Sequence, residues 1–181
     1  MQIDHDLALW FHRNETAALT LFARILTFFG SVAFVTSASI IAALVLLWRK
    51  SRNELLAVVF TMGGGSLLNI FLKHIFHRQR PVLENPLVTL SSYGFPSGHT
   101  MGATLFYGLM ALFATGLCVS WQSRMLAWIG LGALILLVGL SRIYLGAHYL
   151  SNVMGAMAAS IVWLAVCWTA LETLRRRRRL R

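Results

Sequence analysis

Charged residues, prolines and cysteines are all scarce in this sequence. Of its 181 residues 12% are charged, with only six acidic side chains, three prolines and two cysteines, whereas 57% are hydrophobic. So little polar surface excludes a soluble globule of this size. The two cysteines are interpreted as small apolar residues rather than as a disulfide or metal ligands, and no carboxylates stand at metal-ligand spacing.

Long apolar runs occupy most of the chain instead. About 20 mostly apolar residues suffice to cross a bilayer, and five segments approach this length: 19–48, 55–76, 98–119, 125–144 and 149–171. Ahead of them Ile3, Leu7, Trp10 and Phe11 recur at helical spacing, which favours a helix lying in the membrane interface. The predicted fold class is therefore all-α: a polytopic membrane helical bundle of five transmembrane helices with an N-terminal interfacial helix. Gly30-Ser31 is expected to break the first run.

The formal net charge of +10 is unevenly distributed. With five spans, one group of basic residues falls on a single side of the membrane: Arg49, Lys50, Arg52, Arg124, the run Arg175 to Arg179, and Arg181. The positive-inside rule makes that side cytoplasmic and the loop 77–97 external. The arginine run is read as a topology anchor that contacts anionic membrane lipids, not as a nucleic-acid site.

A second set of polar residues is expected at the external face. Lys73, Arg80, His99, Arg142 and His148 reach it from three parts of the sequence, and ionisable residues at such depths mark functional sites. Lysine and arginine suit the oxygens of a phosphate, and two histidines can divide the roles of nucleophile and acid. We expect phosphoryl transfer with no metal and no other cofactor.

The turn from Tyr93 to Thr100 feeds one of these helices. Pro96 fixes φ, and Gly98 permits a close approach to a ligand. The hydroxyl of Ser97 and the backbone N–H of Gly98 would then point out of a helix N-terminus, where an anion is favoured.

Three blocks of this sequence resemble the signature blocks of a known family. They are Lys73-x6-Arg80-Pro81, Pro96-Ser97-Gly98-His99 and Ser141-Arg142-x5-His148, and they look like those of the type 2 phosphatidic acid phosphatase superfamily, which is related to the vanadium haloperoxidases. The resemblance covers about residues 73–152. It implies an integral-membrane lipid phosphatase whose site opens at the external leaflet of the plasma (inner) membrane.

The resemblance also implies a role for each matched residue. His148 would attack phosphorus to form a phosphohistidine, and His99 would protonate the leaving oxygen and then activate water. The remaining matched residues would hold the phosphoryl oxygens as charge develops: Lys73, Arg80, Ser97, Gly98 and Arg142.

Two features depart from the family pattern. An aspartate usually follows the nucleophilic histidine by four residues, and here Asn152 stands there. On a continuous helix its carbonyl would accept the Nδ1–H of His148 without contributing charge, so a working but weakened enzyme is expected. Family members also often have six spans, so six helices is the alternative to five.

The resemblance leaves the substrate open. Undecaprenyl diphosphate, phosphatidylglycerol phosphate and phosphatidic acid all fit as the lipid phosphate. The alternatives are a lipid phosphotransferase of the same fold and a catalytically weakened lipid-phosphate-binding protein. The expected organisation is an interfacial helix over 1–15, a transmembrane phosphatase domain over 16–174 and a basic cytoplasmic tail over 175–181.

Overall fold

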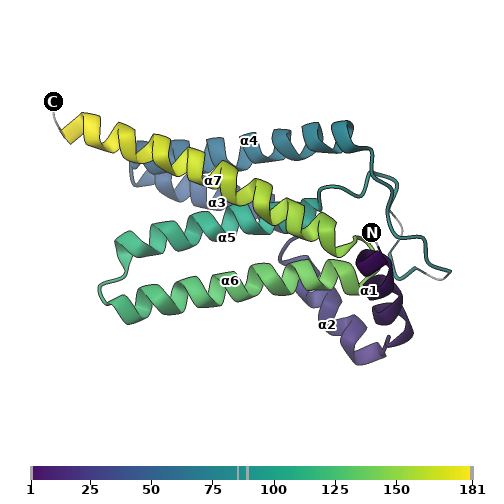
Figure 1. The fold of residues 1–181 in the computed structure, drawn as a ribbon. Coiled ribbons are helices and arrows are strands. Elements are labelled where there is room, and N and C mark those ends of the chain that lie inside the picture. The colour runs from purple at the N-terminus through teal and green to yellow at the C-terminus, as the bar shows by residue number, and fades with distance from the viewer. Residues whose placement is uncertain (1, 85, 89, 180–181) are drawn as a thin grey trace.

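The computed structural model describes residues 2–84, 86–88 and 90–179, and these contain seven helices (Figure 1). In order they are α1 (Gln2–Arg13), α2 (Ala17–Phe28), α3 (Val32–Trp48), α4 (Arg52–Phe76), α5 (Gly98–Leu117), α6 (Trp121–Tyr144) and α7 (Leu150–Arg179). The helices α3 to α7 form an elongated bundle. Helices α1 and α2 lie at one end of it, together with the loop that follows α4, and the C-terminus lies at the other end (Figure 1).

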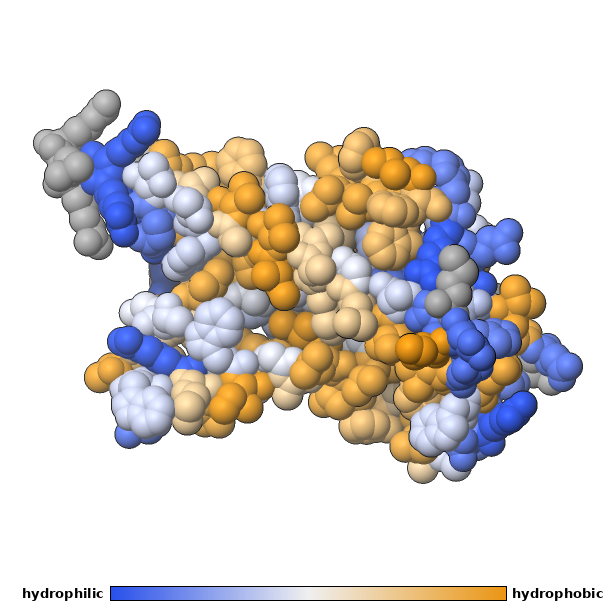
Figure 2. Space-filling model, in the orientation of Figure 1, coloured by the Kyte–Doolittle hydropathy of each residue, from blue (hydrophilic) through white to orange (hydrophobic). Residues whose placement is uncertain are grey.

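Five stretches of the described chain are long and apolar enough to cross a membrane. They are Ala17–Trp48, Arg52–Phe76, Gly98–Leu117, Trp121–Tyr144 and Leu150–Arg177. On the face shown in Figure 2, hydrophobic side chains cover most of the middle of the bundle, and hydrophilic ones gather at its two ends. The prediction of an all-α, multi-pass membrane bundle is therefore confirmed.

The first stretch is divided where the sequence predicts a break. Helix α2 ends at Phe28, and the hydroxyl of Ser31 caps α3 by accepting the N–H of Phe34 at 3.2 Å. Gly30 packs tightly here, because a Cβ on it would lie 2.4 Å from Cγ1 of Val138 and 3.1 Å from the carbonyl oxygen of His99. The break thus brings the α2–α3 corner against the start of α5.

Helix α5 is the centre of the bundle. It packs against α3, α4, α6 and α7, and 56% of its span is buried, compared with at most 28% of the other four. Its first helical residue, Gly98, lies at the end of the bundle that carries the loop 77–97. The matched histidine His99 therefore sits in the first turn of the most buried helix.

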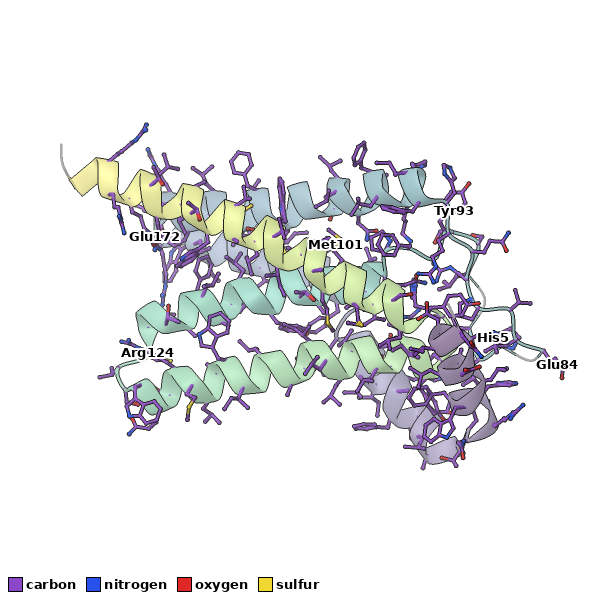
Figure 3. The ribbon with its side chains drawn as sticks, viewed as in Figure 1. His5, Glu84, Tyr93, Met101, Arg124 and Glu172 are labelled. Carbon is purple, nitrogen blue, oxygen red and sulfur yellow. The ribbon has the colours of Figure 1, made fainter. Side chains whose placement is uncertain are left out.

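The two ends of the bundle carry different groups (Figure 3). Arg124 and Glu172 lie at the C-terminal end, whereas His5, Glu84 and Tyr93 lie at the loop end. Arg175 joins α7 to α4 by an ion pair of 2.7 Å with Glu54. Helix α7 continues to Arg179, and residues 180 and 181 of the expected basic tail lie outside the described part of the chain.

Candidate active site

Arg80 joins the long loop to the turn that precedes α7. Its Nη1 donates to the carbonyl oxygen of Ala147 at 2.7 Å and lies 3.0 Å from Nε2 of His148. On the loop side, its Nε and Nη2 donate to the carbonyl and the hydroxyl of Ser92 at 2.7 and 2.9 Å. Two of the predicted site residues, Arg80 and His148, are thus in direct contact.

Lys73 and Arg142 complete the predicted set of cations. Lys73, in the last turn of α4, donates to the carbonyl oxygen of Tyr93 at 2.5 Å, and Nη2 of Arg80 donates to the same oxygen at 3.3 Å. Arg142 is 3% exposed near the end of α6, and its Nη1 donates to the hydroxyl of Thr27 at 2.8 Å. All three cations lie within electrostatic reach of His148.

These three residues, Lys73, Arg80 and Arg142, are called the cation cluster below. Their described hydrogen-bond partners are neutral oxygens and a histidine nitrogen, and none of the ion pairs in the described part of the chain involves them. Cations without carboxylate partners at the end of a membrane bundle are costly unless an anion binds there. Among the described residues no group of three or more His, Cys, Asp or Glu is placed to hold a metal ion.

His148 lies in a tight turn between α6 and α7. Gly146 makes the turn possible with φ of +67°, a left-handed conformation in which a Cβ would also lie 2.6 Å from the side chain of Leu83. The imidazole is buried, and its Nδ1 lies 2.7 Å from the carbonyl oxygen of Gly94. Because a carbonyl can only accept, Nδ1 carries the proton and Nε2 carries the lone pair.

The same surroundings set the protonation state of this imidazole. Burial, together with the charges of Arg80 and Arg142, lowers the pKa of His148 to about 2, against an opposing contribution from the hydrogen bond to Gly94. Burial also lowers the pKa of Arg80, although a guanidinium stays charged at neutral pH. His148 is therefore a neutral imidazole whose electron pair lies on Nε2, as a nucleophile requires.

Asn152 does not form the hydrogen bond that the sequence predicts. Helix α7 begins at Leu150, so His148 precedes the helix and the two residues do not lie on successive turns of it. The Gly94 carbonyl takes the Nδ1–H instead, and the buried amide of Asn152 makes no hydrogen bond with a described residue. Sequence reasoning missed Gly94 because a main-chain acceptor can belong to any residue type.

The start of α5 supplies the remaining predicted residues. Ser97 is fully buried and caps the helix, since its Oγ accepts from the N–H and the hydroxyl of Thr100 at 3.4 and 3.0 Å. Its own N–H donates to the carbonyl of Asn152 at 3.3 Å, which ties α5 to α7. Gly98 and His99 follow in the first turn, at the positive end of the helix dipole. Arg142 and Arg80 lie within electrostatic reach of His99 as well.

The fold and this cluster of residues together define a class of protein. It is a multi-pass helical membrane protein in which a neutral histidine contacts one of three cations that have no carboxylate partner in the described part of the chain, an arrangement suited to phosphoryl chemistry. Comparison with known families agrees with this class. The PAP2 superfamily model matches residues 54–176, which is more than half of the chain. The protein belongs to the PAP2 superfamily, as the three sequence blocks predict.

Two relatives from Bacillus subtilis (strain 168) are similar in sequence. Phosphatidylglycerophosphatase B is 36% identical over 124 residues, which cover 68% of this chain and 60% of that protein. Undecaprenyl-diphosphatase BcrC is 30% identical over 142 residues, which cover 72% of this chain and 68% of that protein. The match thus spans less than two thirds of the length of phosphatidylglycerophosphatase B.

Solved structures show the same fold. The crystal structure of a transmembrane PAP2 type phosphatidylglycerolphosphate phosphatase from Bacillus subtilis superposes with a TM-score of 0.85 at 28% identity, covering 94% of this chain and 85% of that one. Aquifex aeolicus LpxE superposes with a TM-score of 0.71 at 21% identity, covering 91% and 93%. At that identity the second likeness concerns the fold alone.

Proposed function

We propose that this protein is a hydrolase that removes phosphate from a membrane lipid phosphate or diphosphate. One observation carries the proposal. Three cations that have no carboxylate partner among the described residues lie near a neutral imidazole, which Arg80 contacts and whose Nε2 holds a lone pair. A phosphoryl group supplies the negative charge that this arrangement lacks. Residues 16–174 would form the phosphatase domain, flanked by the interfacial segment 1–15 and the tail 175–181.

In the first step, Nε2 of His148 attacks phosphorus and forms an N–P bond while the bond from phosphorus to the leaving oxygen breaks. His99 gives its proton to that oxygen. The cation cluster, together with Ser97 and the N–H groups at the start of α5, stabilises the charge that develops on the phosphoryl oxygens. Asn152 stays a predicted site residue, although the carbonyl of Gly94 and not its side chain accepts the Nδ1–H of His148.

In the second step, water attacks the phosphohistidine. His99, now neutral, takes a proton from the water as its oxygen bonds to phosphorus, and the N–P bond breaks. Inorganic phosphate leaves, and the electron pair returns to Nε2. The carbonyl of Gly94 accepts the Nδ1–H of His148, so the imidazole keeps its tautomer through both steps.

A groove in the bundle suits the hydrocarbon chain of such a substrate. A cavity of about 490 Å³ lies between α3, α4 and α5 and extends from Ser39 and Met62 to Gly98, at the start of α5. Several of its lining residues, including Ile40 and Gly63, are exposed, so the groove opens on the side of the bundle. A lipid could place its phosphate at the cation cluster and its chain in this groove.

The placement of charge supports an orientation. Arg124 and Glu172 lie at the end of the bundle opposite Tyr93 and the loop (Figure 3), and Arg175 donates to Glu172 at that end. By the positive-inside rule the C-terminus would be cytoplasmic, and the site would face the periplasm or the cell exterior at the plasma (inner) membrane.

The activity is tested with the purified chain in detergent micelles, in the presence of EDTA. Release of inorganic phosphate is measured from phosphatidylglycerol phosphate, undecaprenyl diphosphate and phosphatidic acid, the first two being the lipids named in the two relatives. We expect metal-independent release from at least one of them, and none from His148→Ala. Release by His148→Ala at the wild-type rate refutes the proposed nucleophile, and release that depends on an added lipid acceptor would identify a phosphotransferase.

The lipid groove is tested separately at Gly63. Gly63 lines the groove, and a Cβ on it would meet no atom within 4 Å, so Gly63→Leu is expected to fill part of the groove. We expect KM for long-chain substrates to rise while hydrolysis of a short-chain phosphate is retained. Gly130→Leu is the matched control, because Gly130 also has open space around it but does not line the groove. Equal effects of the two substitutions would contradict the assignment of the groove.

A further inference from the structure

Asp4 is an acidic residue that the phosphate site does not use. It lies on α1, is 8% exposed, and accepts hydrogen bonds from Nη2 of Arg78 at 2.7 Å and from the N–H of Ser151 at 2.9 Å. The hydroxyl of Ser151 also donates to it. By contrast Ile3 and Trp10 on the same helix are 74% and 57% exposed. Helix α1 therefore presents a carboxylate to the bundle and apolar side chains to the surroundings.

The contacts continue from Asp4 to the imidazole. Asp4 binds the guanidinium of Arg78. The main-chain carbonyl of Arg78 accepts the N–H of Gly94 at 2.7 Å. Gly94 in turn accepts the Nδ1–H of His148 on its own carbonyl, also at 2.7 Å. The guanidinium of Arg78 further donates to Ser151 at 2.7 Å and lies 5.4 Å from the ring centre of Tyr149, the residue after His148.

We propose that Asp4 is a positioning residue for the nucleophile, acting through Arg78 and the Gly94 peptide to hold the Nδ1–H tautomer of His148. Asp4 thereby takes the place of the carboxylate that the family pattern has at position 152. This inference rests on the proposed function, because it explains how Nε2 keeps its lone pair directed to the substrate.

Charge and geometry both favour this series of contacts from Asp4 to His148. Burial raises the pKa of Asp4, but the hydrogen bonds from Ser151 and Arg78 outweigh it and hold this pKa below its usual value. The carboxylate is therefore charged at neutral pH, and a charged acceptor makes the stronger hydrogen bonds. Gly94 lies close to the loop backbone at Gln79 and Arg78, which allows its N–H to reach the carbonyl of Arg78. A Cβ at this position would lie 2.9 Å from the carbonyl oxygen of Gln79 and 3.3 Å from that of Arg78.

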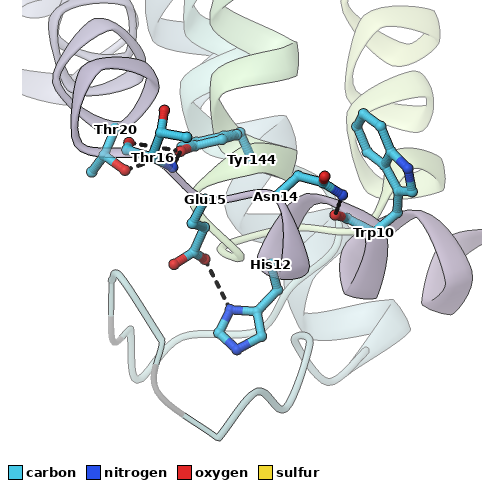
Figure 4. A network of polar contacts seen from close by, with 7 residues as sticks. All are labelled: Trp10, His12, Asn14, Glu15, Thr16, Thr20 and Tyr144. Carbon is cyan, nitrogen blue, oxygen red and sulfur yellow. Dashed lines mark hydrogen bonds and ion pairs between the residues drawn. The ribbon is translucent and has the colours of Figure 1, made fainter.

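Helix α1 is also anchored without Asp4, which makes the residue testable. Beyond the end of α1, the hydroxyl of Tyr144 accepts the N–H of Thr16, which caps α2, at 3.2 Å and lies 3.0 Å from the hydroxyl of Thr20 on α2 (Figure 4). The ring of Phe11 packs edge-on against Tyr144 with 5.9 Å between ring centres. Asp4→Asn is therefore expected to retain the docked helix.

The experiment compares Asp4→Asn with Asp6→Asn in the full-length protein. Asp6 lies on the same helix, is exposed, and makes no hydrogen bond or ion pair with a described residue. We expect Asp4→Asn to lower kcat about ten-fold with KM changed less than about two-fold, and Asp6→Asn to match the wild type. Asp4→Glu, which keeps the charge, should recover part of the loss. Arg78→Gln breaks the same series of contacts at its next residue. The double variant Asp4→Asn, Arg78→Gln should therefore lose no more kcat than Arg78→Gln alone.

A spectroscopic measurement separates positioning from folding. The ¹⁵N-histidine NMR signals of His148, assigned by comparison with His148→Gln, should show protonated Nδ1 in the wild type and in Asp6→Asn. In Asp4→Asn and Arg78→Gln they should shift towards a mixture of the two tautomers, while the melting temperature changes little. An unchanged kcat in Asp4→Asn, or unchanged tautomer signals in both variants, overturns the proposal. If the wild type releases no phosphate from any lipid, the proposed function fails, but the NMR comparison still decides whether Asp4 holds the tautomer.

Discussion

The replacement Asn152→Asp restores the carboxylate of the family pattern and tests how His148 is oriented. The Nδ1–H of His148 already donates to the carbonyl of Gly94 at 2.7 Å, and the Asn152 side chain is fully buried without a hydrogen bond to a described residue. A new carboxylate would therefore have to displace the Gly94 carbonyl before it could orient the ring. We expect kcat to rise by less than about three-fold.

The structure also sets the size of the competing effects. A hydrogen bond to a charged group is worth about 1–2 kcal/mol more than one to a neutral carbonyl, so capture of the Nδ1–H by the carboxylate would raise kcat by about 5- to 30-fold if fully expressed in the transition state. A carboxylate buried at position 152 without a hydrogen-bond donor would lower the unfolding free energy by about 3 kcal/mol. The two outcomes are far enough apart to be distinguished.

The assay measures phosphate release at saturating substrate and denaturant unfolding in the same detergent. Asn152→Ala is the control, because it removes the amide without adding charge. A rise in kcat of ten-fold or more in Asn152→Asp, with unfolding free energy unchanged, would refute the reasoning. The carboxylate would then be the better orienting group, and the Gly94 carbonyl only a substitute for it.

Three further outcomes are expected. Arg80→Lys keeps the charge but loses the guanidinium donors to Ser92 and Ala147. If two hydrogen bonds of about 1.5 kcal/mol are lost in the transition state, kcat/KM falls about 100-fold. A loss below five-fold would contradict the role of the guanidinium. Ser97→Ala removes the cap of α5 and should lower the unfolding free energy by about 1 kcal/mol in a denaturant titration, whereas no change would mean that the cap is dispensable. Between pH 7 and pH 5 the unfolded chain protonates His148, with a pKa of 6.5, whereas the folded chain does not until about pH 2. As the pH falls from 7 to 5, the unfolding free energy of the wild type should therefore drop by about 2 kcal/mol more than that of His148→Gln. The same pH dependence in both proteins would refute the buried neutral imidazole.

Much of the fold could be predicted from composition and spacing. A run of apolar residues long enough to cross a bilayer has few other ways to satisfy its backbone, so the five spans follow from local sequence. The break at Gly30-Ser31 and the turn at Gly146 follow from residues with special backbone preferences. The gathering of Lys73, Arg80 and His148 followed from topology, because helix ends on one side of a membrane must lie at the same depth.

The contacts that orient the imidazole of His148 could not be predicted in this way. The sequence pattern places His148 and Asn152 on one helix, but Gly146 delays the start of α7 until Leu150, and a shift of two residues removes the helical relation. The acceptor that replaces Asn152 is the main-chain carbonyl of Gly94, which lies 54 residues before His148 in the sequence. Asp4 joins through α1, which the amphipathic pattern identifies only as an interfacial helix. Such contacts depend on tertiary packing of a loop, for which no periodicity exists.

The resting contacts of Arg80 have a consequence for how the site responds to substrate. Its Nη1 lies 3.0 Å from Nε2 of His148 and donates to a neutral carbonyl as well, so the lone pair of the proposed nucleophile is engaged before a substrate arrives. Phosphoryl oxygens form charge-assisted hydrogen bonds that are about twice as strong as those to neutral acceptors. An entering phosphate would therefore draw the guanidinium away from Nε2, so the proposed nucleophile would be released by the group that it is proposed to attack.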